Sequence, residues 1–378
     1  MIKFFFTGET MKLEVNYMVE TLKTILEPMI EEGSMEYSNI DLTEKLGFSI
    51  EKVIYDEKTR NLIIITPDRP EKSSIIGKGG WVVGRLREEL NVNSIHVDAY
   101  SDIIIRIYRM DLAIKRLENI VPSIETYISL PLRNLQDLLR LRIDSLGKFN
   151  FLIDYGSDLE LLKNKKSLKN NQLAKDNISD NKAIIALSGG VDSSFSLIIA
   201  KLMGFNPLAA TVDPGNIVLP SYYKNNVENL SKSLKVPHEY IEVDMGSVVK
   251  EAIEGRIHPC GRCSKSIENA LLKYAKKSEI PFLIFGDFLA TGSQSIVSMD
   301  GFWRINLPAM LSATKSETRS LSSYFDINSR GGYGCPLIKE VHKLHPHMRR
   351  FSIQRILRET RAGVLEPGQA LDLITRTL

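Results

Sequence analysis

The stretch Ser188-Gly189-Gly190-Val191-Asp192-Ser193-Ser194 follows a short apolar run, residues 183–187, and precedes a second apolar run, residues 195–203. A strand, a glycine-rich turn and a helix in this order present backbone N–H groups at a helix N-terminus, where the helix dipole attracts phosphate. Two glycines allow the turn and a close approach of the anion. No Gly-Lys-Ser/Thr follows, so this is not a Walker A loop. The stretch predicts a phosphate-binding turn, against the alternative of a serine-glycine turn without a ligand.

Three more apolar segments predict strands at residues 208–213, 239–244 and 282–285, with a helix predicted at 221–234. Short apolar strands that alternate with helices indicate an α/β fold, an open parallel sheet with helices on both faces. Ligands of such sheets bind at the carboxyl ends of the strands. Asp213 and Gly286-Asp287 fall at these ends, as does the serine-glycine stretch, which predicts one shared nucleotide site.

The serine-glycine stretch resembles the pyrophosphate loop of the PP-loop ATP pyrophosphatases, which cleave ATP to AMP and pyrophosphate in order to adenylate a substrate. The resemblance implies an adenine nucleotide α-hydrolase-like fold and a site for ATP and Mg²⁺. The residues that it implies for binding are Ser188, Gly189, Gly190, Asp192, Ser193, Ser194, Asp213, Gly286 and Asp287, with Asp192 also catalytic. Asp287 can instead cap a following helix. Leu307-Pro308 and Lys315-Ser316-Glu317 are similar to a family segment in which a lysine lies near the substrate.

The composition is that of a globular protein, with 43% hydrophobic and 25% charged residues in a chain of 378 residues. This length is sufficient for two or three domains. A net charge of +3 is mild, so a nucleic-acid surface would have to come from local clusters of basic residues. The N-terminal apolar run is too short for a signal peptide, and no run of 18 apolar residues occurs. We therefore expect a cytoplasmic protein without a membrane partner.

The pattern divides the chain into five parts. We predict a KH-like RNA-binding domain with an N-terminal helix at 1–110, a helical connector at 111–160 and a polar linker at 161–182. The PP-loop domain is predicted at 183–340 and a basic helical extension at 341–378. Within these parts, residues 10–32 predict an amphipathic helix, Ile103–Ile107 a further strand, and Pro131 a break between two helices.

Gly77-Lys78-Gly79-Gly80 is a GxxG loop predicted between two helices, directly after Ile75 and Ile76. A loop poor in side chains lets an RNA backbone lie close, and a lysine in it can contact phosphate. With the predicted hairpin before it and the strand 94–99 after it, the segment resembles a KH RNA-binding domain of the type II arrangement. This resemblance implies that Gly77, Lys78, Gly79 and Gly80 bind RNA. A KH-like fold kept only for packing or dimerisation is the alternative.

The chain has three cysteines, Cys260 and Cys263 in a CxxC and Cys335 after a glycine-rich run, residues 331–334. An odd number of cysteines without a secretion signal argues against disulfides and for metal or redox chemistry. A structural zinc ion would need a fourth ligand such as His258. A persulfide pair, a 4Fe-4S cluster on three thiolates with one open iron, and unrelated buried cysteines are the other possibilities.

The region 183–340 resembles the cluster-dependent tRNA thiolation enzymes of the TtcA/TtuA group and the methanogen-type 4-thiouridine synthases. The resemblance is carried by the order of three motifs, which are the loop, the CxxC and the lone Cys-Pro. The resemblance implies that Cys260, Cys263 and Cys335 are metal ligands of a 4Fe-4S cluster and act in catalysis. The chain departs from these families because its N-terminal half resembles a KH domain, where 4-thiouridine synthases carry a THUMP domain, and because it lacks the zinc-knuckle pairs of the TtuA type.

Basic residues gather near the C-terminus, among them Arg349, Arg350 and Arg355. They form either a phosphate-contacting face for RNA or a merely solvated basic face. Taken together, the patterns predict an ATP-dependent tRNA sulfurtransferase whose partners are tRNA and a sulfur donor, either sulfide or a carrier. A ligase or amidotransferase that adenylates a small molecule, and a KH-type RNA-binding regulator that senses nucleotide, are the alternatives. A homodimer is left open.

Overall fold

The computed structural model describes residues 8–33, 36–124, 126–145, 149–163, 181–299, 301–328 and 334–378. The chain divides into two compact units, Met1–Arg106 and Ile107–Leu378. The predicted boundary after residue 110 falls inside a single helix, α5 (Tyr100–Ile120). Most of the predicted polar linker, residues 164–180, lies outside the described residues, and its first three residues end helix α8 (Gly156–Lys163).

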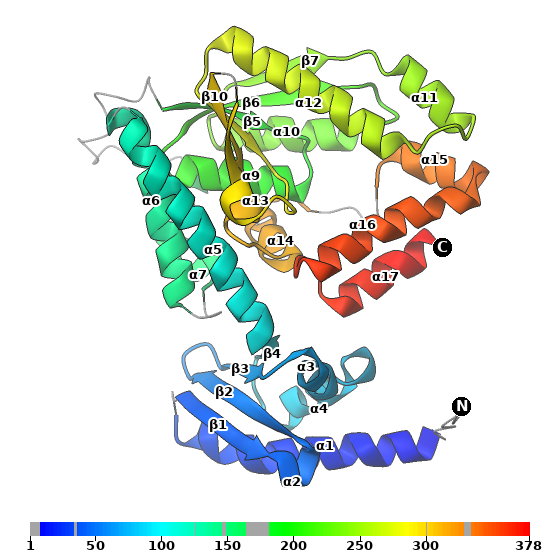
Figure 1. Ribbon diagram of the computed structural model, residues 1–378. Helices are drawn as coiled ribbons and strands as arrows, with labels where there is room; N and C mark the ends of the chain where they lie inside the picture. The colour runs from blue at the N-terminus through cyan, green and yellow to red at the C-terminus, as the bar shows by residue number, and fades with distance from the viewer. Residues whose placement is uncertain are drawn as a thin grey trace. The chain divides into compact units, whose positions relative to one another are not determined.

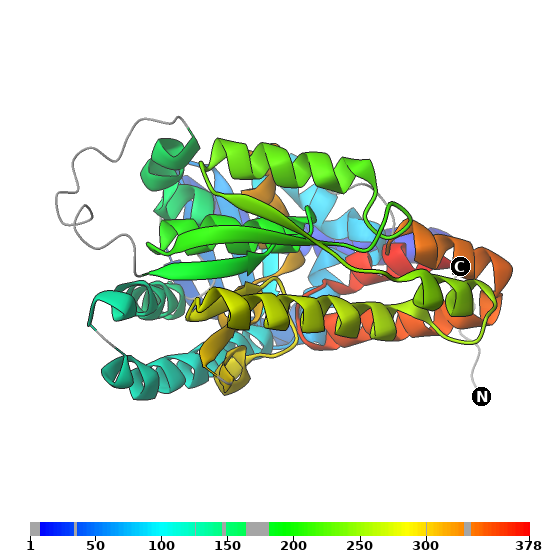
Figure 2. The ribbon, with the colours of Figure 1, turned by 90° about the horizontal axis from the view of Figure 1, so that it is seen from above.

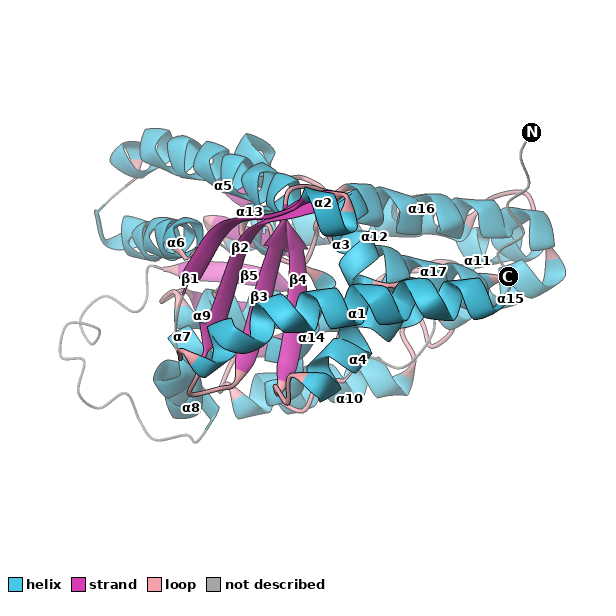
Figure 3. Cartoon of the chain, turned by 90° about the horizontal axis from the view of Figure 1, so that it is seen from below, coloured by secondary structure: helices cyan, strands magenta, loops and turns pink. Residues whose placement is uncertain are grey.

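The first unit is a four-stranded sheet with helices. The strands pair in the order β1-β2-β3-β4; the first three are antiparallel, and β3 and β4 run parallel (Figure 3). Before α5, its elements are α1 (Gly8–Glu31), β1 (Glu36–Leu42), α2 (Thr43–Leu46), β2 (Phe48–Asp56), β3 (Asn61–Thr66), α3 (Arg69–Ile76), the 3-10 turn η1 (Lys78–Gly80), α4 (Trp81–Glu89) and β4 (Ser94–Ala99).

Helix α1 packs on this sheet through residues at helical spacing. Val19, Leu22 and Leu26 are completely buried and share one apolar core with Leu62 and Ile64, which alternate along β3. Buried residues recur with the helical period of 3.6 residues in α1 and with the strand period of 2 residues in β3. Both sets face a single core, as expected for a helix on a half-buried sheet. The predicted amphipathic helix, hairpin and following strand are confirmed.

Two predictions were wrong here. Ile103–Ile107 lies in α5 and not in a strand, because Ile103, Met110 and Leu117 recur at helical spacing and are buried, which outweighs the strand preference of the isoleucines. Pro131 does not separate two helices but lies inside α6 (Thr126–Asp144). The helix break comes earlier, at the 3-10 turn η2 (Val121–Ser123), where Pro122 takes the first turn.

The second unit is built on a six-stranded sheet in the order β7-β6-β5-β8-β10-β9, in which every neighbouring pair is parallel except β9 with β10 (Figure 1). The strands are β5 (Lys182–Ala186), β6 (Asn206–Asp213), β7 (His238–Glu242), β8 (Phe282–Phe285), β9 (Ile296–Met299) and β10 (Phe302–Asn306). The remaining elements are α7 (Phe151–Asp154), α9 (Val191–Leu202), α10 (Ser221–Ser233), α11 (Gly246–Ile253), α12 (Pro259–Ser278), η4 (Gly292–Ser295), α13 (Leu307–Met310), α14 (Lys315–Tyr324), α15 (Pro336–Leu344), η5 (Pro346–Met348), α16 (Arg349–Arg361) and α17 (Pro367–Thr377).

Helices cover both faces of this sheet, as predicted (Figure 2). Successive residues of β5 point to opposite faces, so that Ile185 packs in the core with Phe195 of α9, whereas Ile184 packs with Leu271 of α12. Helix α9 is buried along residues 193–200, because further helices cover the side of it that faces away from the sheet. Among the described residues, no helix is long and apolar enough to cross a membrane.

Candidate active site

The serine-glycine stretch lies at the point where the strand order reverses. From β5 the chain adds β6 and β7 on one side and then returns to place β8 on the other side of β5. The carboxyl ends of β5 and β8 are neighbours at this switch point, and open α/β sheets bind ligands at such a point. Ser188 follows β5, and Gly286 follows β8. The structure places both residues just after parallel strands, as the sequence predicted.

The loop is held against α10 by a contact that only glycine permits. Gly189 has a φ of +74°, and a Cβ atom built there would lie 2.1 Å from the carbonyl oxygen of Tyr223. Asn226 donates a buried hydrogen bond of 2.9 Å from Nδ2 to the carbonyl oxygen of Gly189. Tyr223 and Asn226 both lie on α10, and the sequence analysis did not identify them.

The serines of the loop bond mainly to the loop itself. The hydroxyl of Ser193 accepts a hydrogen bond from the backbone N–H of Ser188 at 3.1 Å and donates one to the carbonyl oxygen of Gly190 at 3.0 Å. The hydroxyl of Ser194 is buried and has no hydrogen-bond partner among the described residues. Ser188 and Ser193 therefore shape the turn, and the backbone N–H groups at the start of α9 are the donors best placed for an anion.

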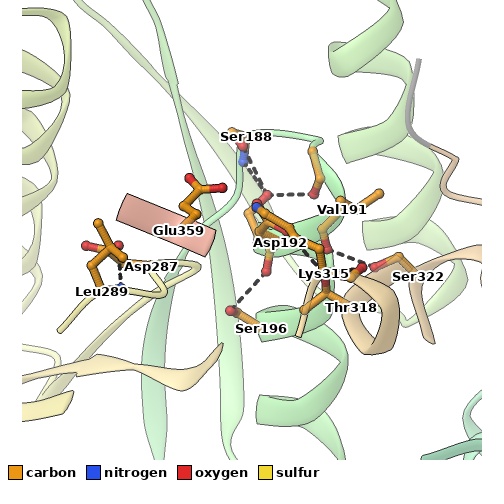
Figure 4. A network of polar contacts seen from close by, with 12 residues as sticks. Ser188, Val191, Asp192, Ser196, Asp287, Leu289, Lys315, Thr318, Ser322 and Glu359 are labelled. Atoms are coloured by element: carbon orange, nitrogen blue, oxygen red, sulfur yellow. Dashed lines mark hydrogen bonds and ion pairs between the residues drawn. The ribbon is translucent and has the colours of Figure 1, made fainter. Parts of the chain in front are cut away.

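Asp192, in the first turn of α9, is paired with a lysine from a distant part of the chain (Figure 4). Lys315 Nζ lies 2.5 Å from Asp192 Oδ2, and the Thr318 hydroxyl donates to Oδ1 at 3.3 Å. The same ammonium group lies 4.2 Å from the centre of the Phe288 ring. The segment 315–317 singled out in the sequence thus brings its lysine to the loop.

Helix α14 holds this lysine in place through its N-terminal cap. Thr314 and Glu317 form a capping box, and the guanidinium of the buried Arg142 donates to Glu317 Oε1 at 2.8 Å. Because Lys315 is the first residue of α14, fixing the cap also fixes the start of the lysine side chain.

Two further predicted residues lie at the strand ends. A Cβ atom on Gly286 would lie 2.8 Å from the backbone of Asp192, so only glycine lets the end of β8 approach the loop. Asp287 Oδ1 accepts a long hydrogen bond, 3.3 Å, from the N–H of Leu289. The alternative that Asp287 caps a helix is wrong, because the next helical element, η4, begins at Gly292 after Thr291.

Asp213, at the end of β6, is ionised in the folded chain. Burial opposes its charge, but the ion pair with Lys224, at 2.5 Å, and the N–H of Gly215 outweigh burial and lower the pKa of the carboxyl. Asp213 is therefore an anion whose charge is already balanced by a lysine, so it is less available to a metal ion than the more lightly bonded Asp287.

The three cysteines come together at the ends of two helices. Cys260 and Cys263 lie in the first turns of α12, and Cys335 is the N-cap residue of α15. Burial raises the pKa of the Cys260 thiol, and burial together with the nearby Cys335 and Cys260 raises the pKa of Cys263 to about 11. The three thiols are thus near enough to one another for Cys335 and Cys260 to affect the pKa of Cys263.

These thiols do not form a closed metal site. Among the described residues, no group of three His, Cys, Asp or Glu side chains is arranged to hold a metal ion. His258, the predicted fourth zinc ligand, is the N-cap residue of α12, and its ring centre lies 5.9 Å from His342 and 5.1 Å from Phe351. Burial lowers the pKa of His258. The glycine-rich run before Cys335 lies outside the described residues at positions 331–333.

The predicted basic face of the C-terminal extension is not uniform. Arg350 is exposed and lies 4.8 Å from the centre of the Phe351 ring, while Arg349 is half-buried. Arg355 donates from Nε to Glu359 Oε1 at 3.3 Å and also forms a hydrogen bond with the Cys260 thiol. Arg355 therefore belongs to the surroundings of the cysteines, a position that the sequence analysis did not predict.

In the first unit, the GxxG loop joins α3 to α4 as predicted. Gly77, Gly79 and Gly80 have φ values of +72°, +67° and +80°, and the Lys78 side chain is exposed. Trp81, the first residue of α4, is 68% exposed, which is unusual for a residue of this size. The loop thus combines an open backbone, a cation and an exposed aromatic ring.

Comparison with known proteins assigns a family but not an activity. No family model matches the chain. The uncharacterized protein MJ1638 of Methanocaldococcus jannaschii is 40% identical over 197 residues, which are 52% of this chain and 75% of that protein. The protein is thus a two-unit α/β protein with a glycine-rich loop at its sheet switch point, and the chain belongs to the same family as MJ1638.

Other similarities are more distant. The tRNA-specific 2-thiouridylase MnmA 1 of Clostridium tetani is 30% identical over 139 residues, 32% of this chain and 36% of that enzyme. Among solved structures, the U34-tRNA thiolase NcsA of Methanococcus maripaludis with its 4Fe-4S cluster superposes with a TM-score of 0.33 at 15% identity, over 57% of this chain and 81% of that chain. NMN synthetase of Francisella tularensis gives a TM-score of 0.35 at 16% identity, over 59% and 91%. The fold described above depends on the strand order and not on these superpositions.

Proposed function

We propose that the protein is an ATP-dependent tRNA sulfurtransferase, which adenylates a base carbonyl and then replaces its oxygen by sulfur. The observation that carries this proposal is that the glycine-rich loop and three cysteines near enough to affect the pKa of Cys263 belong to the same compact unit. The sequence similarity to a tRNA-specific 2-thiouridylase supports the same class of reaction. An enzyme that only activated its substrate with ATP would not need the three thiols. An enzyme that used only thiol chemistry would not need the glycine-rich loop.

In the first step, the oxygen of the base carbonyl attacks the α-phosphorus of ATP, and the bond to pyrophosphate breaks. The N–H groups at the start of α9 would bind the departing pyrophosphate. Lys315, now paired with Asp192, can turn to the phosphates and leave the carboxylate for Mg²⁺. Asp192 and the lightly bonded Asp287 offer the oxygen ligands that Mg²⁺ prefers.

In the second step, a sulfur nucleophile attacks the activated carbon, and AMP leaves with the former carbonyl oxygen. Cys260, Cys263 and Cys335 are the residues that would hold a 4Fe-4S cluster, and metal binding would supply the energy to deprotonate their thiols. Such a cluster would supply the sulfur nucleophile. The chain's own contribution is to keep the site half-buried, so that water competes poorly with sulfur.

The GxxG loop is proposed to bind the RNA substrate. An exposed backbone with three positive-φ glycines lets a polynucleotide lie close, and Lys78 can contact a phosphate. The exposed ring of Trp81 can stack on a base beside the loop. RNA bound there would be the substrate whose base is modified.

The test is the nucleoside content of tRNA from a strain that lacks the gene. We expect one thionucleoside to be missing and to return with the wild-type gene and with Asp372→Asn, which alters a surface carboxylate of α17 paired with Arg376. Asp192→Asn should not restore it, although the protein accumulates normally. If the deletion strain retains all its thionucleosides, the proposed function is wrong.

A further inference from the structure

Helix α14 carries a second cation one turn after Lys315. Arg319 is half-buried, and its Nε is buried without a hydrogen-bond partner among the described residues. No carboxylate in the described part of the chain forms an ion pair with its guanidinium. A half-buried charge without a counter-charge is costly, and a guanidinium bonds best to carboxylate or phosphate. The chemistry of Arg319 therefore favours an anionic ligand.

The neighbours of Arg319 on α14 bond to the first two residues of α9. Lys315, four residues earlier, lies with its Nζ 2.5 Å from Asp192 Oδ2. Ser322, three residues later, donates from its hydroxyl to the carbonyl oxygen of Val191 at 2.8 Å. Figure 4 shows both side chains beside the start of α9. Because residues at i−4 and i+3 share a helix face with residue i, Arg319 belongs to the face of α14 that meets the glycine-rich loop.

The helix also sets the direction of the Arg319 side chain. Each Cα–Cβ bond of an α-helix tilts toward the N-terminus, so a long side chain covers the turn that precedes it. For Arg319 this turn begins with Lys315, the first residue of α14. Cβ atoms four residues apart on a helix lie about 6 Å from each other. The guanidinium therefore reaches the region beside the lysine ammonium group.

The two cations differ in how their charges are balanced. Lys315 is paired with Asp192, whereas Arg319 has no such carboxylate among the described residues. The N–H groups at the start of α9 already favour phosphate at this place. A planar guanidinium can donate to two phosphate oxygens at once, which an ammonium group does less well. The arrangement fits a ligand with several negative charges close together.

We propose that Arg319 binds the pyrophosphate group of ATP at the start of α9. The ligand is magnesium pyrophosphate, either free or as the β- and γ-phosphates of ATP. When the bond from the α-phosphorus to its bridging oxygen breaks, the electron pair stays on pyrophosphate. The guanidinium stabilises this added charge without giving up a proton, so Arg319 is a catalytic residue. The inference rests on the proposed function, in which ATP is cleaved at this bond. The sequence analysis did not identify Arg319.

The test measures the binding of two products separately on the full-length chain. Inorganic pyrophosphate and AMP, each with Mg²⁺, are titrated into wild type and variants in a calorimeter. Arg319→Gln should raise the Kd of pyrophosphate about tenfold, the effect of a lost charge-assisted contact. The Kd of AMP should stay within about twofold, because AMP lacks the group that Arg319 contacts. Arg319→Lys should lose less than Arg319→Gln, since it keeps the charge but not the planar fork.

Urea unfolding distinguishes ligand binding from a structural role. An uncompensated cation does not stabilise the ligand-free fold, so Arg319→Gln should have a urea midpoint equal to or above that of the wild type. Saturating pyrophosphate should raise the midpoint of the wild type more than that of Arg319→Gln. Arg358→Gln is the matched control, because it removes an exposed arginine of α16. It should leave the Kd of pyrophosphate within about twofold, since exposed charges are screened by salt.

Three results would overturn the inference. The first is an unchanged Kd of pyrophosphate in Arg319→Gln. The second is an equal loss of pyrophosphate and AMP binding together with a lower urea midpoint, which would mark a structural residue. The third is a wild-type chain that binds neither pyrophosphate nor ATP, which would contradict the proposed function as well. The thionucleoside content of tRNA tests sulfur transfer separately.

Discussion

The two glycine-rich loops of this protein both lead into a helix, yet they are built in opposite ways. In the loop at 188–190, Gly189 is pressed against the backbone of α10, and the serines bond within the turn. In the loop at 77–80, a Cβ atom on Gly80 would meet open space, and Lys78 is exposed. Close packing requires glycine at position 189, whereas backbone conformation alone requires it at position 80.

This difference corresponds to two kinds of anion. A loop enclosed by its own protein presents a fixed set of N–H groups, which suits a compact phosphate that must be held during a reaction. A loop open to solvent leaves room for a long polymer to lie across it. Substitutions in the enclosed loop should therefore affect stability strongly, whereas those in the open loop should mainly affect binding.

The largest effect is expected for Gly189→Ala. The new methyl group would overlap the carbonyl oxygen of Tyr223, and φ would stay in the left-handed region, so the free energy of unfolding should fall by about 4 kcal/mol. Urea unfolding measures this loss. Gly190→Ala is the matched control, because its φ of −82° and nearest contact of 3.6 Å allow a methyl group. Equal losses in the two variants would show that the packing of Gly189 is not what constrains this loop.

A smaller loss of stability is expected for Asp98→Asn in β4, a strand of the unit that contains the open loop. Asp98 is buried with Lys72; burial opposes its charge, but His96, Lys72 and Arg106 outweigh burial and lower its pKa well below 3.8. Asp98→Asn leaves Lys72 without its carboxylate and should cost about 3 kcal/mol at pH 7.

This stabilisation has a defined pH dependence. A carboxyl group with a lowered pKa stabilises the fold above its unfolded value, 3.8, and ceases to do so as the pH falls through its folded value. The difference in urea midpoint between Asp98→Asn and the wild type should therefore shrink as the pH is taken below 3.8. A difference that stays constant into acid would mean that the charge of Asp98 is not its source.

Within the open loop, two glycines should differ from each other. Gly77→Ala would bring a methyl group within 2.5 Å of the Val82 side chain, whereas Gly80→Ala meets nothing within 4 Å. Thermal unfolding should show a loss of about 2 kcal/mol for the first and about 1 kcal/mol for the second, which is the left-handed strain alone. If both cost as much as Gly189→Ala, the contrast between the two loops fails.

The smallest effect is expected for Lys78→Ala. The side chain is exposed, so stability should not change, while tRNA affinity should fall about threefold and the dependence of affinity on salt should lose about one phosphate contact. Filter binding over a range of salt concentrations measures both. Lys58→Ala, in the turn between β2 and β3, changes a lysine away from the loop and should leave the salt dependence as it is.

Much of this architecture could be predicted, because the local sequence patterns place the same residues in the core as the folded structure does. The apolar run of β5 and the helical spacing in α1 are patterns that tertiary packing preserves, and the glycines after β5 and β8 mark the ends of these strands. Ile103–Ile107 was misread because three consecutive isoleucines favour a strand locally, and only the spacing to Met110 and Leu117 reveals the helix. Strands β9 and β10 were not predicted.

The contacts that complete the candidate site could not be predicted, because they join residues far apart in the sequence. Tyr223 and Asn226 look like ordinary residues of a polar helix. Nothing in the sequence around them indicates that they contact Gly189. The pairing of Arg355 with Glu359 fits an ordinary surface pair at i and i+4. Only the burial of Glu359 and the contact of Arg355 with Cys260 distinguish it.

The central claim is that ATP cleavage by the enclosed loop serves sulfur insertion into RNA. The direct test incubates the full chain with ATP, sulfide and tRNA and measures AMP and thionucleoside in the same sample. We predict that both form only with tRNA and in equal molar amounts. Thionucleoside without AMP, or AMP release that needs a small molecule and no tRNA, would contradict the claim.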